Sequence, residues 1–266
     1  MTTTISSSRF SMTRALAIAR HEFRVLLRDP TFLIVMIGMP VVVMAFVSKV
    51  FRFALADEGY RNVTGAEQAV PGVTVMFTFF LVGSVGFVFF REHGWGTWER
   101  LRASRARPFE IMVGKCMPVL AHAALQQTVL FGLGAALFGL RVRGSIVALV
   151  VVGAAFSVCL ITLGVAVTSL CRTANQNNAI SNVGAMLMAG LGGAIAPISA
   201  LPEWARVIAP GTPSYWAMRG FRAVILDAGG IPQVLPSVAA MLLFAVAFTV
   251  FSLYRFRFEE TKISWA

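Results

Sequence analysis

Residues 145–170 read SIVALVVVGAAFSVCLITLGVAVTSL and carry no charged side chain. An α-helix rises about 1.5 Å per residue, so roughly 20 apolar residues cross a bilayer core of about 30 Å. This stretch is therefore predicted to span a membrane as a helix. The whole chain follows the same pattern, because 57% of its 266 residues are hydrophobic and only 13% are charged, against roughly 25% in soluble domains.

Further apolar runs predict an all-α integral membrane protein, a single transmembrane domain over residues 1–266 with six transmembrane helices. The predicted spans are about Phe32–Val50, Val70–Phe90, Met117–Leu140, Ser145–Leu170, Ala179–Ile195 and Leu235–Tyr254. Pro40 lies in the first span, where a proline is tolerated if neighbouring groups satisfy the freed carbonyl, and we expect a kink there. A removable signal peptide is not expected, because no early apolar run precedes a small-residue cleavage site.

Residues 12–28 precede the first span and are predicted to form an amphipathic helix in the membrane interface. At helical spacing, apolar residues gather on one side and basic residues on the other. The apolar side holds Met12, Leu16, Ala19, Phe23, Leu26 and Leu27, and the basic side holds Arg14, Arg20, His21, Arg24 and Arg28. Asp29-Pro30 is then expected to turn the chain into the membrane. The alternative for this segment is an ordinary solvated helix.

The distribution of basic residues predicts which side of the membrane each segment faces. Segments that alternate from the amino terminus hold fifteen basic residues on one side and eight on the other. Cytoplasmic loops carry the excess of Lys and Arg. Both termini and residues 91–115 are therefore expected in the cytoplasm, and residues 197–227 outside.

Residues 91–115 are polar, rich in arginine and long enough for a helix outside the bilayer. They begin Arg91-Glu92-His93-Gly94-Trp95-Gly96-Thr97-Trp98-Glu99-Arg100-Leu101-Arg102 and end Glu110-Ile111-Met112-Val113-Gly114-Lys115. This resembles the pattern of type-2 ABC exporter permeases, in which an acidic pair leads to Gly-Thr, then Glu and Leu, then Glu-Ile and Gly-Lys. The alternative is a solvated basic loop held near anionic lipid, which the positive-inside bias alone would produce.

A second stretch carries the same resemblance. Residues 197–227 contain four prolines and the sequences Leu201-Pro202-Glu203-Trp204 and Pro213-Ser214-Tyr215, which are similar to the family's extracellular re-entrant helices before the last span. Among these permeases, the chain most resembles bacterial drug-resistance permeases related to daunorubicin exporters. The resemblance implies a multi-pass protein of the bacterial plasma membrane that exports a hydrophobic or amphipathic drug; export of a lipid, a glycan or an ion is the alternative.

The family also implies partners: a second permease chain, identical or different, and separate ATPase subunits that hold ATP and Mg²⁺. This chain has no G-x-x-x-x-G-K-[ST] loop, because Cys116 follows Gly114-Lys115 and no glycine stands five places before Gly114. We therefore expect no cofactor on this chain and no ATPase site of its own.

The resemblance implies that a helix around Trp98 to Ser104 is seated in a groove of the ATPase. The residues that it assigns to coupling with the ATPase are Glu92, Gly96, Thr97, Trp98, Glu99, Arg100, Leu101 and Arg102. Trp98 and Leu101 are expected to pack into a groove of the ATPase. Polar residues, namely Glu99, Arg100 and Arg102, are expected at the rim of that groove, as in other protein interfaces.

In this family the substrate passes between two permease chains, along the second and fifth spans. Aromatic, amide and sulfur-containing side chains of these spans are candidate lining groups, because such surfaces suit an apolar cargo. They are Phe77, Phe80, Phe87, Asn182, Met186 and Met188. For each phenylalanine, the alternative is ordinary packing against lipid or a neighbouring helix.

Other classes of function are disfavoured. His21, His93 and His122 are isolated and lack metal-ligand spacing, so no metal site is expected. A membrane enzyme would need a paired nucleophile and base at membrane depth, which the spans do not offer. Basic residues lie in short segments between spans, so nucleic acid is not an expected partner. A channel or secondary carrier is the most distant alternative. Ionisable residues within the spans are scarce, which argues against a carrier coupled to protons or ions.

Overall fold

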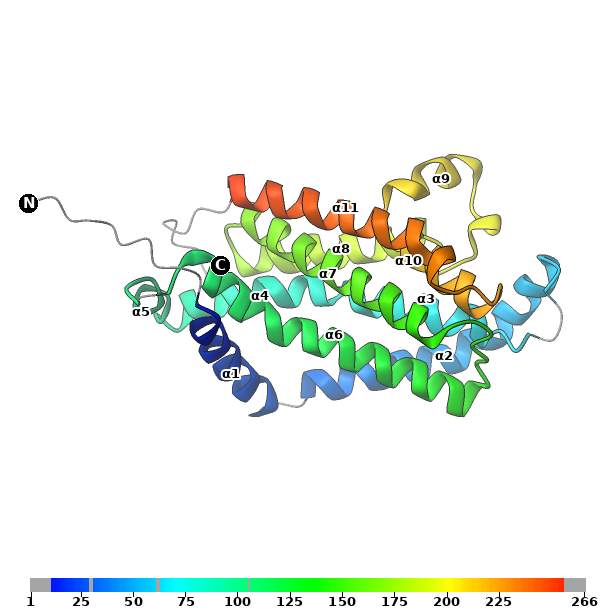
Figure 1. Ribbon diagram of the computed structural model, residues 1–266, viewed down its shortest axis with the longest axis horizontal. Helices are drawn as coiled ribbons and strands as arrows, with labels where there is room; N and C mark the ends of the chain where they lie inside the picture. Colours follow the sequence, from blue (N-terminus) through cyan, green and yellow to red (C-terminus); the bar gives the residue numbers. More distant parts are fainter. Residues whose placement is uncertain (1–10, 29–30, 61–62, 105, 256–266) are drawn as a thin grey trace, which may run out of the picture.

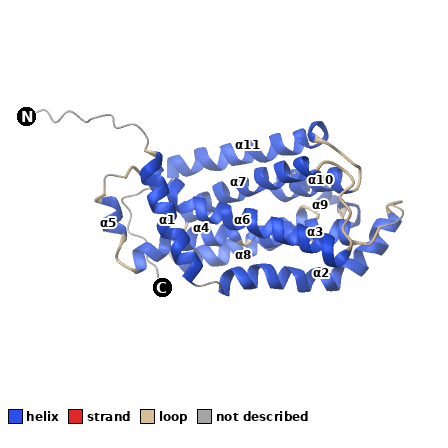
Figure 2. Cartoon of the chain, turned by 60° about the horizontal axis from the view of Figure 1, so that its bottom comes forward, coloured by secondary structure: helices blue, strands red, loops and turns tan. Residues whose placement is uncertain are grey.

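The structure is a computed structural model that describes residues 11–28, 31–60, 63–104 and 106–255. Every regular element in these ranges is a helix (Figure 2). The long helices run side by side, with α5 (Trp98–Arg102) at one end of the bundle and α9 (Glu203–Ile208) at the other (Figure 1). The predicted all-α class is therefore confirmed for the described part of the chain.

The bundle consists of α2 (Thr31–Asp57), α3 (Ala66–Phe79), α4 (Leu81–Gly94), α6 (Pro108–Phe138), α7 (Ile146–Leu170), α8 (Ala174–Leu191) and α11 (Ile231–Arg255). Five stretches of the described chain are long and apolar enough to cross a membrane: α2, α3 continued by α4, α6, α7 and α11. By contrast, α8 has 18 residues and a polar start that includes Asn175, Asn177 and Asn178. Its assignment as a sixth span stays a prediction.

The helix that contains the second predicted span begins at Ala66, four residues before that span, and its polar start is buried in the protein. Helix α3 begins at Ala66, and Glu67 and Gln68 are both buried. The Glu67 carboxylate accepts hydrogen bonds from the backbone N–H of Thr64 and Gly65, both at 3.0 Å. These bonds satisfy donors that precede the first turn, so a polar residue stabilises the helix start.

Residues 197–227 form short helices, as their prolines predict. They comprise η1 (Ile198–Ala200), α9, η2 (Ala209–Gly211) and α10 (Pro213–Ile225). One face of α10 packs against α3, α7 and α11 and buries Ala217, Phe221 and Val224. Whether these helices re-enter a membrane stays a prediction.

The main apolar core lies where α3, α6, α7 and α10 meet. Phe79 of α3 packs edge-on against Phe156 of α7, with ring centroids 5.5 Å apart. Phe221 of α10 and Phe131 of α6 have centroids 5.2 Å apart. Close packing of this kind, rather than exclusion of water, holds helices together inside a membrane.

Helices α4 and α8 cross at close range because α4 has glycine at the crossing. A Cβ atom on Gly86 would lie 2.2 Å from the side-chain amide of Asn177. That amide donates a hydrogen bond to the Gly83 carbonyl oxygen at 3.2 Å. A larger residue at position 86 would therefore push the two helices apart.

The proline in α2 leaves one carbonyl without its usual donor, and a glutamine from another helix replaces that donor. Pro40 has no N–H, so the carbonyl of Met36 loses its i→i−4 bond. The side chain of Gln126 in α6 donates to this carbonyl at 2.8 Å. This contact meets the condition under which a proline is tolerated inside a membrane-spanning helix.

Helix α1 (Met12–Arg28) occupies the residues predicted for the leading helix and packs against α6 at the end of the bundle that carries α5 (Figure 2). The Asp29-Pro30 turn, the side chains of Leu26 and Leu27, and both chain termini lie outside the described residues. Placement of α1 in a membrane interface stays a prediction.

Candidate functional site

A buried lysine joins three helices at the end of the bundle that carries α1 and α5. Lys115 of α6 is 1% exposed. Its Nζ lies 2.8 Å from Oε1 of Glu22 in α1 and 2.9 Å from Oε1 of Glu92 in α4. One ammonium group therefore bridges two carboxylates that are themselves buried, which is the pairing that buried charges require.

Two further groups complete this arrangement. Arg91 of α4 pairs with the second carboxylate oxygen of Glu22, and the Thr97 hydroxyl donates to the second oxygen of Glu92. We call Glu22, Arg91, Glu92 and Lys115 the charge cluster. It contains equal numbers of positive and negative groups and ties α1, α4 and α6 together, while Thr97 connects it to the start of α5.

The Glu-Ile and Gly-Lys pairs of the sequence motif attach α1 to α6. Glu110 accepts the backbone N–H of Ser11 at 2.7 Å and that of Arg107 at 2.9 Å, so one carboxylate caps the starts of both helices. Farther along α6, a Cβ atom on Gly114 would lie 2.8 Å from the Ala15 carbonyl oxygen. Glycine is therefore needed where α1 crosses α6.

Helix α5 is anchored by an inward-facing tryptophan. Trp98 is 3% exposed and stacks on His93, with ring centroids 4.6 Å apart. It belongs to a small apolar cluster that includes Phe89 of α4 and Val119 of α6. Gly96, with φ +65°, makes the turn from α4 into α5 in a left-handed conformation that suits glycine.

This packing corrects one expectation about contact with a partner. Trp98 was expected to insert into a partner's groove, but its ring is buried inside this chain, so it positions α5. Glu92, a predicted coupling residue, is buried in the charge cluster, and its coupling role stays a prediction. The exposed residues of α5 are Glu99, Arg100 and Arg102, which we call the α5 surface, and Leu101 is half-buried beside them.

The arginines predicted on the leading helix are on its outer side. Arg20, Arg24 and Arg28 are all exposed, whereas Glu22, which the sequence analysis did not single out, is buried. Of the predicted apolar side, Ala19 is buried and Met12 and Leu16 are about half exposed, and the latter two are available to a membrane.

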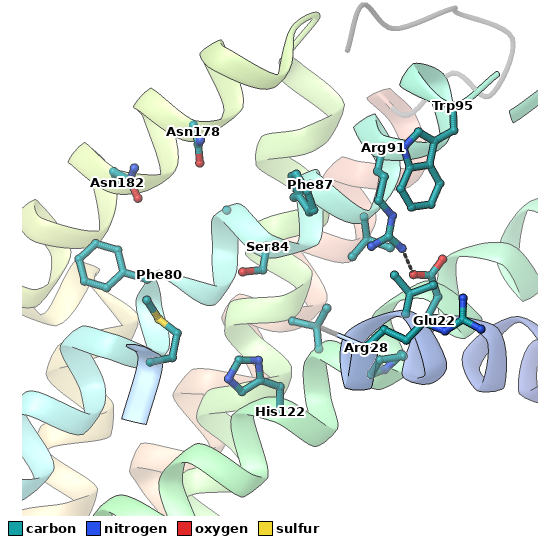
Figure 3. Close-up of a pocket in the computed structure, with 16 residues that line it drawn as sticks. Glu22, Arg28, Phe80, Ser84, Phe87, Arg91, Trp95, His122, Asn178 and Asn182 are labelled. Atoms are coloured by element: carbon teal, nitrogen blue, oxygen red, sulfur yellow. Dashed lines mark hydrogen bonds and ion pairs between the residues drawn. The ribbon is translucent and has the colours of Figure 1, made fainter. Parts of the chain in front are cut away.

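A cavity of about 690 Å³ lies beside the charge cluster, among α1, α2, α4, α6 and α8. Its lining residues are Glu22, Val25, Arg28, Met36, Phe80, Gly83, Ser84, Phe87, Val88, Arg91, Trp95, Pro118, Val119, His122, Asn178 and Asn182. Figure 3 shows the charged groups gathered near Trp95, with Phe80, Asn182 and His122 toward the other side. In the described ranges, no three His, Cys, Asp or Glu side chains could hold a metal ion.

Three of the six predicted path residues line this cavity: Phe80, Phe87 and Asn182. The other three lie elsewhere. Phe77 is buried in the main core and packs edge-on against Phe80, and Met188 packs against the same core. Met186 is 59% exposed on the surface of α8. Phe77 lies in α3 and faces the core, whereas Phe80, between α3 and α4, lines the cavity. Residue type alone could not indicate this difference.

Comparison with known proteins gives a family. A sequence model of the ABC-2 type transporter family matches residues 13–226. The probable multidrug ABC transporter permease YbhR of Escherichia coli is 28% identical over 116 residues, which is 43% of this chain and 31% of that protein. The linearmycin resistance permease protein LnrN of Bacillus subtilis is 25% identical over 202 residues, 75% of this chain and 52% of that protein.

The chain thus matches 31% of the length of one of these curated relatives and 52% of the other. The family match is broader, because it runs from α1 to the end of α10 and includes the charge cluster, α5 and every residue that lines the cavity. On this match, together with its five apolar helices, the protein belongs to the ABC-2 type transporter family, the membrane subunits of transporters.

Proposed function

We propose that this chain is the permease subunit of an ATP-binding-cassette exporter, which moves a hydrophobic or amphipathic substrate out of a bacterial cell. A separate ATPase subunit supplies the energy by hydrolysing ATP with Mg²⁺. The observation that carries the proposal is the charge cluster, because it links an exposed helix at one end of the bundle to the helices that line a cavity.

The mechanical link runs through side chains. Thr97, at the start of α5, is bonded to Glu92, and Glu92 is bonded to Lys115 of α6. The same helix α4 carries Ser84 and Phe87 into the cavity. A displacement of α5 by a moving ATPase is therefore transmitted to the cavity wall as a rigid-body shift of α4, α6 and α1, one of the known modes of conformational coupling.

The α5 surface is the proposed contact with the ATPase. It presents two arginines and a glutamate on five residues of helix, with Glu99 and Arg102 in an ion pair at 3.1 Å. Because exposed ion pairs of this kind contribute little to folding, these charges are available to pair with a partner. Such complementarity fixes the orientation of an interface.

A second permease chain is proposed to pack on α2 and α8. Both helices expose an apolar face, with Ile34, Val35, Met39, Val42, Phe46 and Val50 on α2 and Ile180, Val183, Met186 and Leu187 on α8. The cavity has residues of both helices in its wall, Met36 from α2 and Asn178 and Asn182 from α8. Pairing there would enclose the cavity between two chains.

Transport by the reconstituted complex tests the proposal. The permease, purified with its ATPase and placed in vesicles, should move an apolar dye only with ATP and Mg²⁺. Phe80→Ala should change the order in which different dyes are transported, because its ring lines the cavity. The matched control is Phe251→Ala, on the exposed side of α11 and outside the cavity lining. Transport at the same rate without ATP would identify a carrier or channel and overturn the proposal.

A further inference from the structure

We propose that the cavity binds an amphiphile with an anionic headgroup, held by Arg28 and Arg91, with its apolar tail between α4, α6 and α8. As a statement about cargo, this rests on the proposed export function. As a statement about binding, it rests on the charges, contacts and shape of the cavity alone.

Among the residues that the structure describes, Glu22 is the one carboxylate in the cavity lining, and it is already occupied. Both oxygens of Glu22 are bound, one by Lys115 and the other by Arg91. Glu92, behind it, is bound by Lys115 and Thr97. The described part of the wall therefore offers a cationic ligand no free carboxylate.

Positive charge, by contrast, is in excess among the described residues. Around this end of the cavity, they comprise three cations, Arg28, Arg91 and Lys115, and two carboxylates, Glu22 and Glu92. Arg28 is exposed and has no ion pair with any residue in the described ranges. Its guanidinium offers a planar set of donors suited to carboxylate, sulfate or phosphate.

Arg91 is held in a fixed orientation beside the cavity. Its guanidinium lies 4.9 Å from the centroid of the Trp95 ring and 5.9 Å from that of Phe87. Contacts of this type restrict an arginine that already makes an ion pair. The headgroup site thus combines one restrained and one unpaired guanidinium.

The rest of the cavity suits the body of an amphiphile. Met36, Phe80 and Val119 offer apolar contacts, and Ser84, Asn178 and Asn182 offer hydrogen bonds without charge. Figure 3 shows Arg28, Arg91 and Glu22 on the side away from Phe80 and Asn182. A volume of about 690 Å³ lies in the range that holds a drug-sized ligand.

Trp95 supplies a direct readout, because it lines the cavity and bromine quenches indole fluorescence on contact. The purified chain is placed in nanodiscs of zwitterionic lipid without an ATPase. A fatty acid brominated near its carboxyl end and the alkyltrimethylammonium ion of equal length brominated at the matching position are then titrated, so that the bromine of a bound ligand lies beside Trp95. Four other tryptophans remain in the chain, so quenching at the cavity is measured as the difference between the unaltered chain and Trp95→Phe. In this difference the fatty acid should quench at about tenfold lower concentration than the cation.

Two arginines of α1 provide the matched comparison. Arg28→Gln should abolish the preference for the anion, whereas Arg24→Gln, which is equally exposed but outside the cavity lining, should retain it. Equal quenching by the two bromo compounds in the unaltered chain would overturn the proposal. So would an equal loss in both variants, since that would reflect the general charge of α1.

A final arm identifies the source of the anionic group. Brominated anionic phospholipid is built into the nanodisc, and a non-brominated fatty acid is added. Quenching that persists identifies a membrane lipid as the occupant, and quenching that is displaced identifies a free amphiphile; no quenching by either anion overturns the proposal. Because no ATPase is present, failure to recruit one would leave these results unchanged, and loss of the charge preference would leave the permease assignment standing.

Discussion

Lys115 is the residue on which the charge cluster depends, because it contacts both carboxylates. Replacing it with methionine keeps most of the side-chain volume but leaves Glu22 and Glu92 buried with Arg91 as their only cation in the cluster. Removing one partner from a buried ion pair typically costs about 3–5 kcal/mol. We therefore expect Lys115→Met to lower the free energy of unfolding in detergent by about that amount.

The control for this prediction is Arg102→Met, which breaks the exposed ion pair with Glu99 and should unfold close to the unaltered protein. Glu22→Gln added to Lys115→Met should recover part of the loss, since it removes one of the unpaired charges. Equal stability of Lys115→Met and Arg102→Met would show that the cluster does not hold the helices together.

The sequence alone predicts only part of the charge cluster. Glu92 and Gly114-Lys115 stand in a recognisable motif, but nothing in one sequence pairs them with Glu22, which is 93 positions from Lys115. The one available cue is that Glu22 is the sole acidic residue of Met12–Arg28. Trp98 shows the converse: residue type suggested an interface, but packing against His93 turned the ring inward.

The helices could be predicted more fully than the charge cluster, because the thickness of a membrane sets the length of a span and hydropathy indicates its position in the sequence. Helix α1 and the five apolar spans follow from pattern alone. The exceptions are places where polar groups are satisfied by protein. Glu67 and Gln68 lie in the first turn of α3, before the predicted span. Asn177, which is bonded to the Gly83 carbonyl, lies near the start of α8, in residues that hydropathy predicts to be a loop.

The bond between Gln126 and the Met36 carbonyl predicts a specific coupling between two substitutions. Gln126→Leu removes the side-chain donor, and Pro40→Ala restores the backbone N–H that bonds the same carbonyl. Gln126→Leu should therefore lower the free energy of unfolding less in a chain that also carries Pro40→Ala. A double-mutant cycle on unfolding in detergent should give a coupling free energy of about 1 kcal/mol. Additive effects would mean that the glutamine does not substitute for the missing N–H.

For the whole molecule, the orientation in the membrane makes a prediction of its own. Helices α5 and α9 lie at opposite ends of the bundle (Figure 1), and the excess of basic residues predicts α5 on the cytoplasmic side. With Cys116, Cys159 and Cys171 changed to alanine, Glu203→Cys should react with an impermeant maleimide in intact cells. Glu99→Cys should react only after the cells are opened, and the reverse pattern would invert the topology.

The molecule as a whole joins three features that the sequence placed in separate segments: the leading helix, the motif at 91–115 and the candidate substrate path. They meet because α1, α4 and α6 share one buried set of charges, beside which the cavity opens. Phe80, Phe87 and Asn182 could be chosen from residue type and span. Arg28, Ser84 and His122 could not, since their role depends on how the helices are rotated.

The most direct test of the permease assignment is recovery of an ATPase with the tagged chain in mild detergent. We expect a P-loop ATPase in stoichiometric amount, which should be lost in Arg100→Glu because this variant reverses a charge on the α5 surface. It should be retained in Arg143→Glu, an exposed arginine in the α6–α7 connection. Recovery of the chain without an ATPase, or equal recovery in both variants, would contradict an ATP-driven permease coupled through α5.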